Sequence, residues 1–379
     1  MAVPASLSAL PAAQVFHFPG KGSRPHFDVF RALGARQPGH SVKTNRPKLE
    51  EIARIAGVSK ATVDRVLNNR PGVQQHTRQH VLHVLQSLGG EGAGGGSGRS
   101  RIDFVLPGGR NAFIADLAQH IERQAAQRGD VEVHIHRFEA IEPERIAATL
   151  DSLKGMTRGV ALIGLDSPLV RESVRRLIAS GVDVLTLVSD ISHVGRVSYV
   201  GIDNRAAGRL AGYLIGRFLP GAKGKVALIA GALAYRGHEE REMGFRHILR
   251  ERFPDMEIVA PPEIREDPDR AYEEVRALLG RFPDLLAIYC IGAGGEGVAR
   301  AMVEKGRAQS VVFIGHDLTD NTRAYLLDGV MDAVIDQNAR VEARDAIDRL
   351  LRAVRGETDI PQTTVRIQSV FSENIPSEV

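Results

Sequence analysis

From Arg101 to the end of the chain, short apolar runs alternate with amphipathic stretches of helix length. Alternation of this kind is the pattern of a parallel sheet covered by helices on both faces. About eight strands over about 260 residues are more than one compact sheet usually needs, so we expect two similar α/β lobes. The expected strands are IDFVL, VEVHI, GVALI, DVLTL, KVALIA, LLAIYCI, VVFIG and MDAVI.

Residues 49–88 show a different pattern, that of three short helices. Gly57 supplies a tight turn after the first helix, and Ser59 is a good N-cap for the second. The apolar positions expected to form a small core are Leu49, Ile52, Ala53 and Ala56, then Val63, Val66 and Leu67, and then Val81, Leu82, Leu85 and Leu88.

The second of these helices keeps a polar outward face. Its exposed residues are expected to be Lys60, Ala61, Asp64, Arg65 and Asn68. A helix whose exposed N-terminal side chains reach base edges is what readout of the DNA major groove requires. The pattern therefore predicts a helix-turn-helix.

The same segment resembles the LacI/GalR (lactose-repressor) family of bacterial transcriptional regulators. The resemblance rests on L-x-x-I-A-x-x-A-G-V-S-x-A-T-V-x-R-V-L-N, followed by G-V-x-x-x-T-R. It implies that Lys60, Ala61 and Arg65 occupy base-reading positions, with Arg65 the best candidate for a bidentate contact to guanine. It also implies that Ser59, Thr62, Asn68, Gln74 and Thr77 contact the DNA backbone.

Asp64 stands where relatives commonly have Ser. A carboxylate would repel a phosphate, so we expect Asp64 to pair with Lys60 at i, i+4 or to accept a hydrogen bond from a cytosine amine.

The resemblance also implies a two-lobed effector domain similar to periplasmic sugar-binding proteins, with two doubly wound parallel sheets behind the all-α head. The chain is then expected to cross between the lobes near Asp203, near Gln337 and near Thr364. The expected domains are an extension over 1–45, a helix-turn-helix over 46–88, a linker over 89–100 and an effector domain over 101–379. Lobe one takes 101–203 and 338–363, and lobe two takes 204–337 and 364–379.

Charge is distributed unevenly along the chain. Residues 1–101 contain 14 Lys and Arg against 5 Asp and Glu, whereas the remainder contains 35 against 41. A basic head on an acidic body is expected when only one part contacts phosphates.

The segment GGEGAGGGSG over 89–98 has the composition of a flexible linker. Typical members of the family carry there a Tyr-x-Pro-Asn-x-x-Ala-Arg hinge helix, which is missing from this sequence. Insertion of that helix into the minor groove is therefore not expected. The extension over 1–45 reads as a disordered tail without an assigned role.

No apolar run approaches the roughly 18 residues that a membrane span needs, and the N-terminus lacks the features of a secretory signal. The single cysteine, Cys290, lies in an apolar run, which favours an inert core thiol and suits a reducing compartment. We therefore expect a cytoplasmic protein. His134 and His136 have no evident third partner, so no metal site is expected.

Ligands of open α/β sheets bind beyond the carboxyl ends of the strands, here between the lobes. The polar and aromatic residues at those ends suit a neutral polyhydroxylated ligand, with Phe113 stacking on a sugar ring and Arg241 aimed into the cleft. These residues also match the polyol-contacting motifs of the family, which are N-x-F, S-D, R-x-x-G, G-x-D and D-Q. The candidate ligand residues are Asn111, Phe113, Asp190, Arg241, Asp317 and Gln337.

One motif favours another class of ligand. Gly292–Gly297 reads G-x-G-x-x-G between a strand and a helix, and Asp317 follows at the end of the next strand. Such an arrangement is typical of a dinucleotide site, so the alternative is a nicotinamide-cofactor enzyme or a redox-sensing regulator. Against it, the motif lies late in its lobe, outside the first strand-helix-strand unit.

The sequence shows no G-x-S-x-G elbow, no Walker loop and no carboxylate pair with an assignable acid and base. We therefore expect no enzyme activity and no cofactor. The prediction is a homodimeric transcriptional regulator that binds a palindromic DNA operator and whose operator affinity is controlled by a small sugar or polyol.

Overall fold

The computed structural model describes residues 48–68, 70–87, 99–107, 109–138 and 140–377. The chain divides into two compact units, Met1–Gly95 and Gly96–Val379, each of which is described by itself. The extension expected over 1–45, and residues 89–98 of the expected linker, lie outside the described residues.

The N-terminal unit contains three helices, α1 (Leu49–Ile55), α2 (Lys60–Leu67) and α3 (Gln75–Ser87). Gly57 connects α1 to α2 with φ +62°, a left-handed conformation that glycine adopts without strain. Ser59 begins α2, because its Oγ accepts a hydrogen bond from the Thr62 backbone N–H at 3.1 Å. The three helices surround a small core of Ile52, Ala53, Ala56, Val63, Val66, Val81, Val84 and Leu85.

Among the described residues this core differs from the expectation at two positions, and Leu88 lies outside the described residues. Leu49 is 40% exposed and Leu82 is 38% exposed, so neither belongs to the core. Leu49 is the first residue of α1. In α3, Val81, Val84 and Leu85 face the core, and Leu82 lies on the outer side of the helix.

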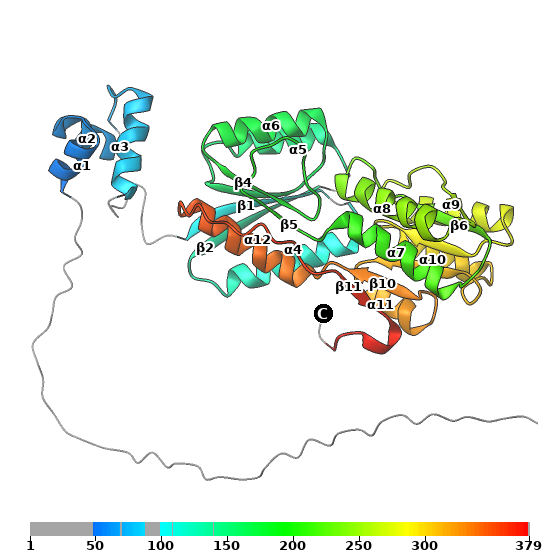
Figure 1. Cartoon of the computed structure of the whole chain (residues 1–379). Coiled ribbons are helices and arrows are strands. Elements are labelled where there is room, and N and C mark those ends of the chain that lie inside the picture. The colour runs from blue at the N-terminus through cyan, green and yellow to red at the C-terminus, as the bar shows by residue number, and fades with distance from the viewer. Residues whose placement is uncertain (1–47, 69, 88–98, 108, 139, 378–379) are drawn as a thin grey trace, which may run out of the picture. The chain divides into compact units, whose positions relative to one another are not determined.

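Lobe one is a parallel sheet in the order β2-β1-β3-β4-β5. Helices α5 and α6 cover one face of it, and α4 and α12 cover the other (Figure 1). Its elements are β1 (Ser100–Pro107), α4 (Ala112–Ala126), β2 (Val131–Phe138), α5 (Pro143–Ser152), β3 (Gly159–Ile163), α6 (Pro168–Ala179), β4 (Asp183–Leu187), β5 (Ser198–Val200) and α12 (Ala339–Val354).

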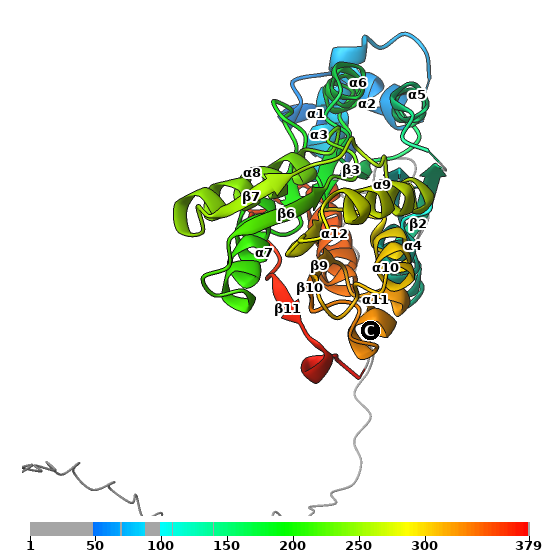
Figure 2. The same cartoon turned by 90° about the vertical axis from the view of Figure 1, so that its right-hand side faces the viewer.

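Lobe two is a six-stranded sheet in the order β11-β10-β9-β8-β6-β7, in which only β11 runs antiparallel to its neighbour. Figure 2 shows α7 and α8 on one side of this sheet and α9, α10 and α11 on the other. Its elements are α7 (Asn204–Phe218), β6 (Gly224–Ile229), α8 (Arg236–Arg252), β7 (Met256–Val259), α9 (Pro268–Arg281), β8 (Ala287–Cys290), α10 (Gly295–Glu304), β9 (Val312–His316), α11 (Asp320–Leu327), β10 (Ala333–Asp336), β11 (Gln368–Val370) and a 3₁₀ turn η1 (Ser372–Asn374).

The chain passes between the two sheets three times. It leaves lobe one between β5 and α7, returns between β10 and α12, and leaves again between α12 and β11. On the last passage the backbone N–H of Val365 donates to the carbonyl of Gly201 at 2.8 Å, so two of the crossings lie side by side.

All eight strands expected from the apolar runs are present, and the structure adds β5, β7 and β11. These three strands are only three or four residues long, and each contains at least one residue that is not buried. Each lies at the edge of its sheet. A strand there has only one neighbouring strand and is covered less completely, so its apolar run in the sequence is shorter. Within the described part of the chain, no helix is long and apolar enough to cross a membrane.

Candidate functional site

The outward face of α2 carries the expected DNA-contacting side chains. Ser59, Lys60, Ala61, Arg65 and Asn68 are exposed. Thr62 and Thr77 are half-buried, and Gln74 is exposed just before α3. Among the described residues, the guanidinium of Arg65 has no hydrogen-bond or ion-pair partner, so its donors are open to solvent.

The expected pair between Lys60 and Asp64 does not form. Lys60, at the start of α2, instead reaches Glu50 of α1. The Asp64 carboxylate accepts hydrogen bonds from Asn68 Nδ2 at 2.8 Å and from Arg70 Nη1 at 3.3 Å. The i, i+4 neighbour that pairs with Asp64 is therefore Asn68, and these exposed contacts are weak enough for a nucleic acid to displace.

In the second unit, two adjoining cavities lie between the lobes and share Asn111, Phe113, Glu266, Gly292 and Asp317 in their walls. Their lining residues follow the carboxyl ends of β1, β4, β8, β9 and β10, together with the N-terminal turns of α4 and α8. This is the edge at which parallel α/β sheets bind ligands.

Two predicted residues of lobe one lie in these walls. Phe113, in the first turn of α4, is 5% exposed and lines both cavities. Asn111 is the N-cap of α4, since its Oδ1 accepts from the Ile114 backbone N–H. Its Nδ2 donates across the cleft to Glu266 Oε2 at 3.0 Å, so the Asn111 amide connects the lobes.

Arg241 projects from α8 into the wall of the second cavity and is 2% exposed. Its Nε donates to Asn204 Oδ1 at 2.7 Å, and its Nη1 donates to the carbonyl of Ile291 at 2.8 Å. The guanidinium is thereby fixed, and it keeps donors for a ligand.

Asp317 and Gln337 form a buried pair at the ends of β9 and β10. Gln337 Nε2 donates to Asp317 Oδ1 at 2.8 Å, and Gln337 Oε1 has no hydrogen-bond partner among the described residues. Burial raises the pKa of Asp317 to about 7, against the lowering effect of Arg241. Both side chains line the second cavity, and Asp317 lines the first as well.

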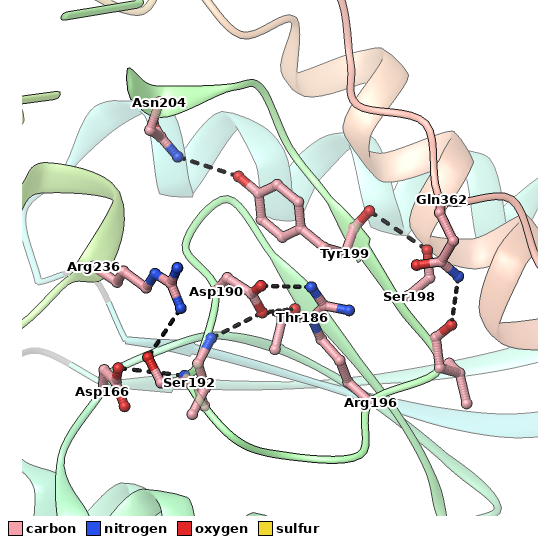
Figure 3. Close-up of polar contacts among 12 residues, drawn as sticks. Asp166, Thr186, Asp190, Ser192, Arg196, Ser198, Tyr199, Asn204, Arg236 and Gln362 are labelled. Atoms are coloured by element: carbon pink, nitrogen blue, oxygen red, sulfur yellow. Dashed lines mark hydrogen bonds and ion pairs between the residues drawn. The ribbon is translucent and has the colours of Figure 1, made fainter. Parts of the chain in front are cut away.

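Asp190, the remaining predicted residue, lines neither cavity. Arg196 holds its carboxylate with two hydrogen bonds of 2.6 Å, and Thr186 Oγ1 adds a third of 2.6 Å (Figure 3). Burial acts to raise the pKa of Asp190, but these hydrogen bonds outweigh it and hold that pKa below its ordinary value.

The carboxylate of Asp190 is therefore saturated by its own lobe, and we leave it out of the proposed ligand site. The two residues just before it, Val188 and Ser189, line the second cavity instead.

Sequence reasoning missed two residues of the cavity wall, Glu266, which is buried, and His238, which is partly buried. Glu266 accepts a hydrogen bond from the Ala293 backbone N–H at 3.1 Å in addition to that from Asn111, and burial raises its pKa. Burial lowers the pKa of His238 to about 3, so this imidazole is neutral at physiological pH. No sequence signal singles out Glu266, because it precedes Asp267-Pro268, which read simply as the start of α9.

The glycines of the dinucleotide-like motif have structural roles here. Gly294 adopts φ +107° as the N-cap of α10, and a Cβ on Gly297 would lie 1.9 Å from the Pro268 carbonyl oxygen of α9. The backbone N–H of Ala293, inside the motif, already donates to the Glu266 carboxylate. The Glu266 carboxyl group therefore occupies a backbone donor that a bound pyrophosphate would need, which is a physical argument against that alternative.

No group of three or more His, Cys, Asp or Glu side chains suited to hold a metal ion occurs in the parts of the chain that the structure describes. Cys290 is buried, and burial raises the pKa of its thiol to about 12. With this pKa the thiol is almost entirely protonated at neutral pH, as expected of an inert cysteine in the core.

Comparison with known proteins identifies both units. Residues 48–89 match the family model "Bacterial regulatory proteins, lacI family", and residues 102–358 match that of the periplasmic binding protein domain. The transcriptional regulator CelR of Thermobifida fusca is 28% identical over 335 residues, which cover 84% of this chain and 95% of CelR. MalR of Streptomyces coelicolor is 36% identical over 174 residues, but these cover only 43% of this chain and 48% of that regulator.

Among solved structures, a solute-binding protein of an ABC transporter from Burkholderia graminis, in complex with D-arabinose, superposes with a TM-score of 0.70. It is 22% identical, and the match covers 75% of this chain and 99% of that protein. Nothing in these comparisons supports a dinucleotide-dependent enzyme or redox regulator.

Proposed function

Because the chain belongs to the lacI family of bacterial regulatory proteins and is a DNA-binding transcriptional regulator, we propose that a small sugar or polyol bound between its lobes controls its affinity for operator DNA. We also propose that the head spans 46–88 and the effector domain 101–379, the bounds expected from the sequence. The protein acts by binding, and its site of action is the cytoplasm, where bacterial DNA lies.

The observation that carries the proposal is the composition of the cavity wall. An aromatic face, Phe113, stands beside a fixed guanidinium, Arg241, and the buried pair of Asp317 and Gln337. Hydroxyl groups both donate and accept hydrogen bonds, so a polyol satisfies this mixture of groups. A solute-binding protein with the same fold is known in complex with D-arabinose, which is consistent with the proposal.

On the DNA side, we propose that Arg65, Lys60 and Ala61 read base edges. The remaining contacts set the register on the phosphate backbone, and we assign them to Ser59, Thr62, Asn68, Gln74 and Thr77. We further propose that two copies of the chain bind as a homodimer to the half-sites of a palindromic operator, since a two-fold dimer presents two recognition helices.

Two measurements test the proposal. Thermal-shift screening of the full chain against pentoses, hexoses, polyols and NAD is expected to show stabilisation by a sugar or polyol and none by NAD. A mobility-shift titration on DNA upstream of its own gene then compares affinity with and without that ligand. An operator affinity that stays the same at saturating sugar would refute the control by ligand, although DNA binding itself would stand.

A further inference from the structure

A glutamate is buried where the two lobes meet. Glu342 lies in the first turn of α12, directly after the chain has crossed from lobe two back to lobe one. We propose that its carboxyl group is a proton switch of the hinge: gain of a proton by Glu342 favours the arrangement of the lobes seen here, and loss of that proton favours their separation. The switch goes beyond the proposed control by a sugar, since it does not depend on which ligand fills the cleft.

The carboxyl group of Glu342 is enclosed by protein. The residue is 0% exposed, and neither Oε1 nor Oε2 has a hydrogen-bond partner among the described residues. An ionised carboxylate is strongly disfavoured in such surroundings, whereas the uncharged acid is tolerated more easily. In this arrangement of the lobes Glu342 is therefore held in its protonated form.

The charged and titratable groups that interact with Glu342 come from both lobes. They are Asp317 after β9, Asp336 at the end of β10 and Arg241 in α8 from lobe two, and Tyr199 in β5 and Asp345 in α12 from lobe one. Burial is the largest cause that raises the pKa of Glu342 well above its ordinary value, the aspartates add to the rise, and Arg241 opposes it. Because burial dominates, the rise persists when Asp317 and Asp336 are themselves protonated.

The other charged groups near α12 have partners of their own. Arg241 donates to Asn204 Oδ1 and to the Ile291 carbonyl, and neither contact involves Glu342. On the elements packed against α12, His120 and Asp116 of α4, Asp103 of β1 and Asp183 of β4 interact with Arg340, Asp320, Arg101 and Arg158 respectively. A negative charge on Glu342 would therefore have no paired cation among the described residues.

The same face of α12 holds the chain passages between the lobes. Arg349 lies seven residues after Glu342 and so on the same side of the helix. Its Nη1 donates to the Tyr199 carbonyl at 3.0 Å, and its Nη2 donates to the Thr363 carbonyl at 2.8 Å. Tyr199 stands just before the first crossing and Thr363 lies on the third, while Glu342 follows the second. Glu342 therefore belongs to the helix that contacts all three passages.

Hinge motion changes the surroundings of Glu342. Asp317, Asp336 and Arg241 belong to lobe two, whereas Glu342 moves with lobe one, so a rotation about the passages changes the distances between them. Separation of the lobes also admits water to a carboxyl group that is enclosed here, and hydration favours its ionised form. The proton is therefore held more tightly in the arrangement seen here than in separated lobes.

The direction of the pH effect follows by linkage. A group whose pKa is raised in one arrangement favours that arrangement at low pH, because it keeps a proton there that the other arrangement has lost. The preference is complete below the ordinary pKa of glutamate, about 4.3, and it is lost as pH rises toward the raised pKa of the buried form. Between these two pKa values the equilibrium between the arrangements shifts by about tenfold per pH unit.

Energy transfer between dyes on the two lobes tests the proposal in the full chain without a ligand. Ala148 in α5 and Lys305 at the end of α10 are exposed positions of lobe one and lobe two. Ala148→Cys with Lys305→Cys provides the attachment sites, since Cys290 is buried. We expect the transfer efficiency to change between about pH 5 and about pH 9 as one proton is released and the lobes separate. A constant efficiency across this range would overturn the proposal.

Variants then identify the group that titrates. Glu342→Gln and Glu342→Met each replace the acid with a neutral side chain of similar size, and both are expected to keep the transfer efficiency of the acidic state at every pH. Asp348→Asn, the matched control, removes a half-exposed carboxylate of the same helix that pairs with Arg128, and it is expected to keep the pH response. Asp317→Asn is also expected to keep it. A response that survives in both Glu342 variants, or that disappears in Asp317→Asn alone, would assign the effect to another group and overturn the proposal.

Infrared spectroscopy detects the proton itself. A protonated carboxyl group and an ionised carboxylate absorb at different frequencies, so the difference between the natural protein and Glu342→Gln isolates the absorption of Glu342. We expect the band of the acid at about pH 6, where a glutamate in water is ionised, and its replacement by the carboxylate band over the pH range in which the transfer efficiency changes. A carboxylate band already present at about pH 6 would contradict the proposal.

Discussion

Individual buried side chains set the chemistry of the cleft between the lobes. Asp317 is 8% exposed at φ +67° and is paired with Gln337, so its carboxyl group is held in place but poorly solvated. A carboxyl group in this environment is easier to keep protonated than in water. The ionisation of Asp317 therefore opposes folding over a defined pH range.

That range follows from the pKa of Asp317, which is about 7 in the folded protein and about 3.9 in an unfolded chain. Between these values the folded state binds more protons, so stability falls as pH rises from about 4 to about 7. Asp317→Asn removes this loss. We expect its stability relative to the natural protein to improve by about 1–4 kcal/mol from pH 4.5 to pH 8.

Urea denaturation at the two pH values measures this difference, with Asp328→Asn as the control for loss of an exposed carboxylate. If the free energies of unfolding of the two variants changed in parallel with pH, the Asp317 carboxyl group would not be the source of the pH dependence.

On the head, Arg65 combines exposure with unengaged donors. Removing a bidentate contact to guanine costs about 1–3 kcal/mol of discrimination, so Arg65→Ala is expected to lower the ratio of operator affinity to the affinity for unrelated DNA by about 5- to 150-fold. Fluorescence anisotropy on both DNAs measures the ratio. Ligand-induced thermal stabilisation of the same variant should persist, and its loss together with DNA binding would indicate misfolding instead.

At the scale of elements, the start of α7 joins the first crossing to the ligand cavity. Asn204 is buried there, where its Oδ1 accepts from Arg241 and its Nδ2 donates to Tyr199 Oη at 3.2 Å and to the Val188 carbonyl at 3.3 Å. Tyr199 Oη donates to the same Val188 carbonyl at 3.0 Å. Figure 3 shows Asn204 and Tyr199 directed toward each other beside the Asp190 cluster.

These contacts hold Val188 at φ +64°, an unusual conformation for a β-branched residue. Two residues of the cavity wall, Arg241 and Val188, are therefore held by hydrogen bonds to Asn204 at the first crossing.

This arrangement predicts that Asn204 positions Arg241 for the ligand. Asn204→Ala is expected to weaken effector binding about tenfold, because the guanidinium loses a buried partner and its fixed direction. Titration of the effector measures the change. The neighbouring variant Asp203→Ala is the matched control, since Asp203 caps α7 through the Ala206 N–H at 2.9 Å.

Loss of that cap is expected to lower stability by about 0.5–2 kcal/mol while leaving effector affinity nearly unchanged. Equal effects of the two variants on affinity would assign Asn204 a purely structural role.

At the scale of the whole molecule, the lobes contact one another directly at several points. Asn111 reaches Glu266, and Ser192 Oγ accepts from Arg236 Nη1 at 2.9 Å (Figure 3). Further contacts join Arg110 to Asp269, the backbone N–H of Asp166 to the Ala234 carbonyl, and the backbone N–H of Gly237 to Ser189 Oγ. Three chain passages also connect the lobes, an arrangement that allows hinge motion. A ligand that bridges the lobes changes the balance between their arrangements.

If such a balance controls the head, the coupling is reciprocal. The factor by which the effector changes operator affinity must equal the factor by which operator DNA changes effector affinity. Titrating effector into the protein with and without saturating operator, and operator with and without effector, measures both factors. A factor of about 5–150 in the two directions is expected. A factor of one in both would show that the head and the effector domain act independently.

Much of this architecture is predictable because it depends on local patterns. The eight apolar runs became strands, and Ser59, Asn111 and Asp203 cap helices where short polar side chains precede helical periodicity. The edge strands β5, β7 and β11 escaped prediction, because runs of three or four residues are too short to show a periodic pattern.

The sequence by itself determined the class of the protein: a helix-turn-helix head, and two α/β lobes whose strand ends bring Phe113, Arg241, Asp317 and Gln337 to one cleft. Tertiary structure alone decided which polar groups in that cleft are free. Asp190 satisfies the strand-end rule, yet Arg196 from its own lobe saturates it, whereas Glu266 follows no motif and is brought to the cavity by a strained loop. The reason is that strand ends are set by local periodicity, but hydrogen-bond partners come from residues distant in the chain, and only the packed fold fixes their positions.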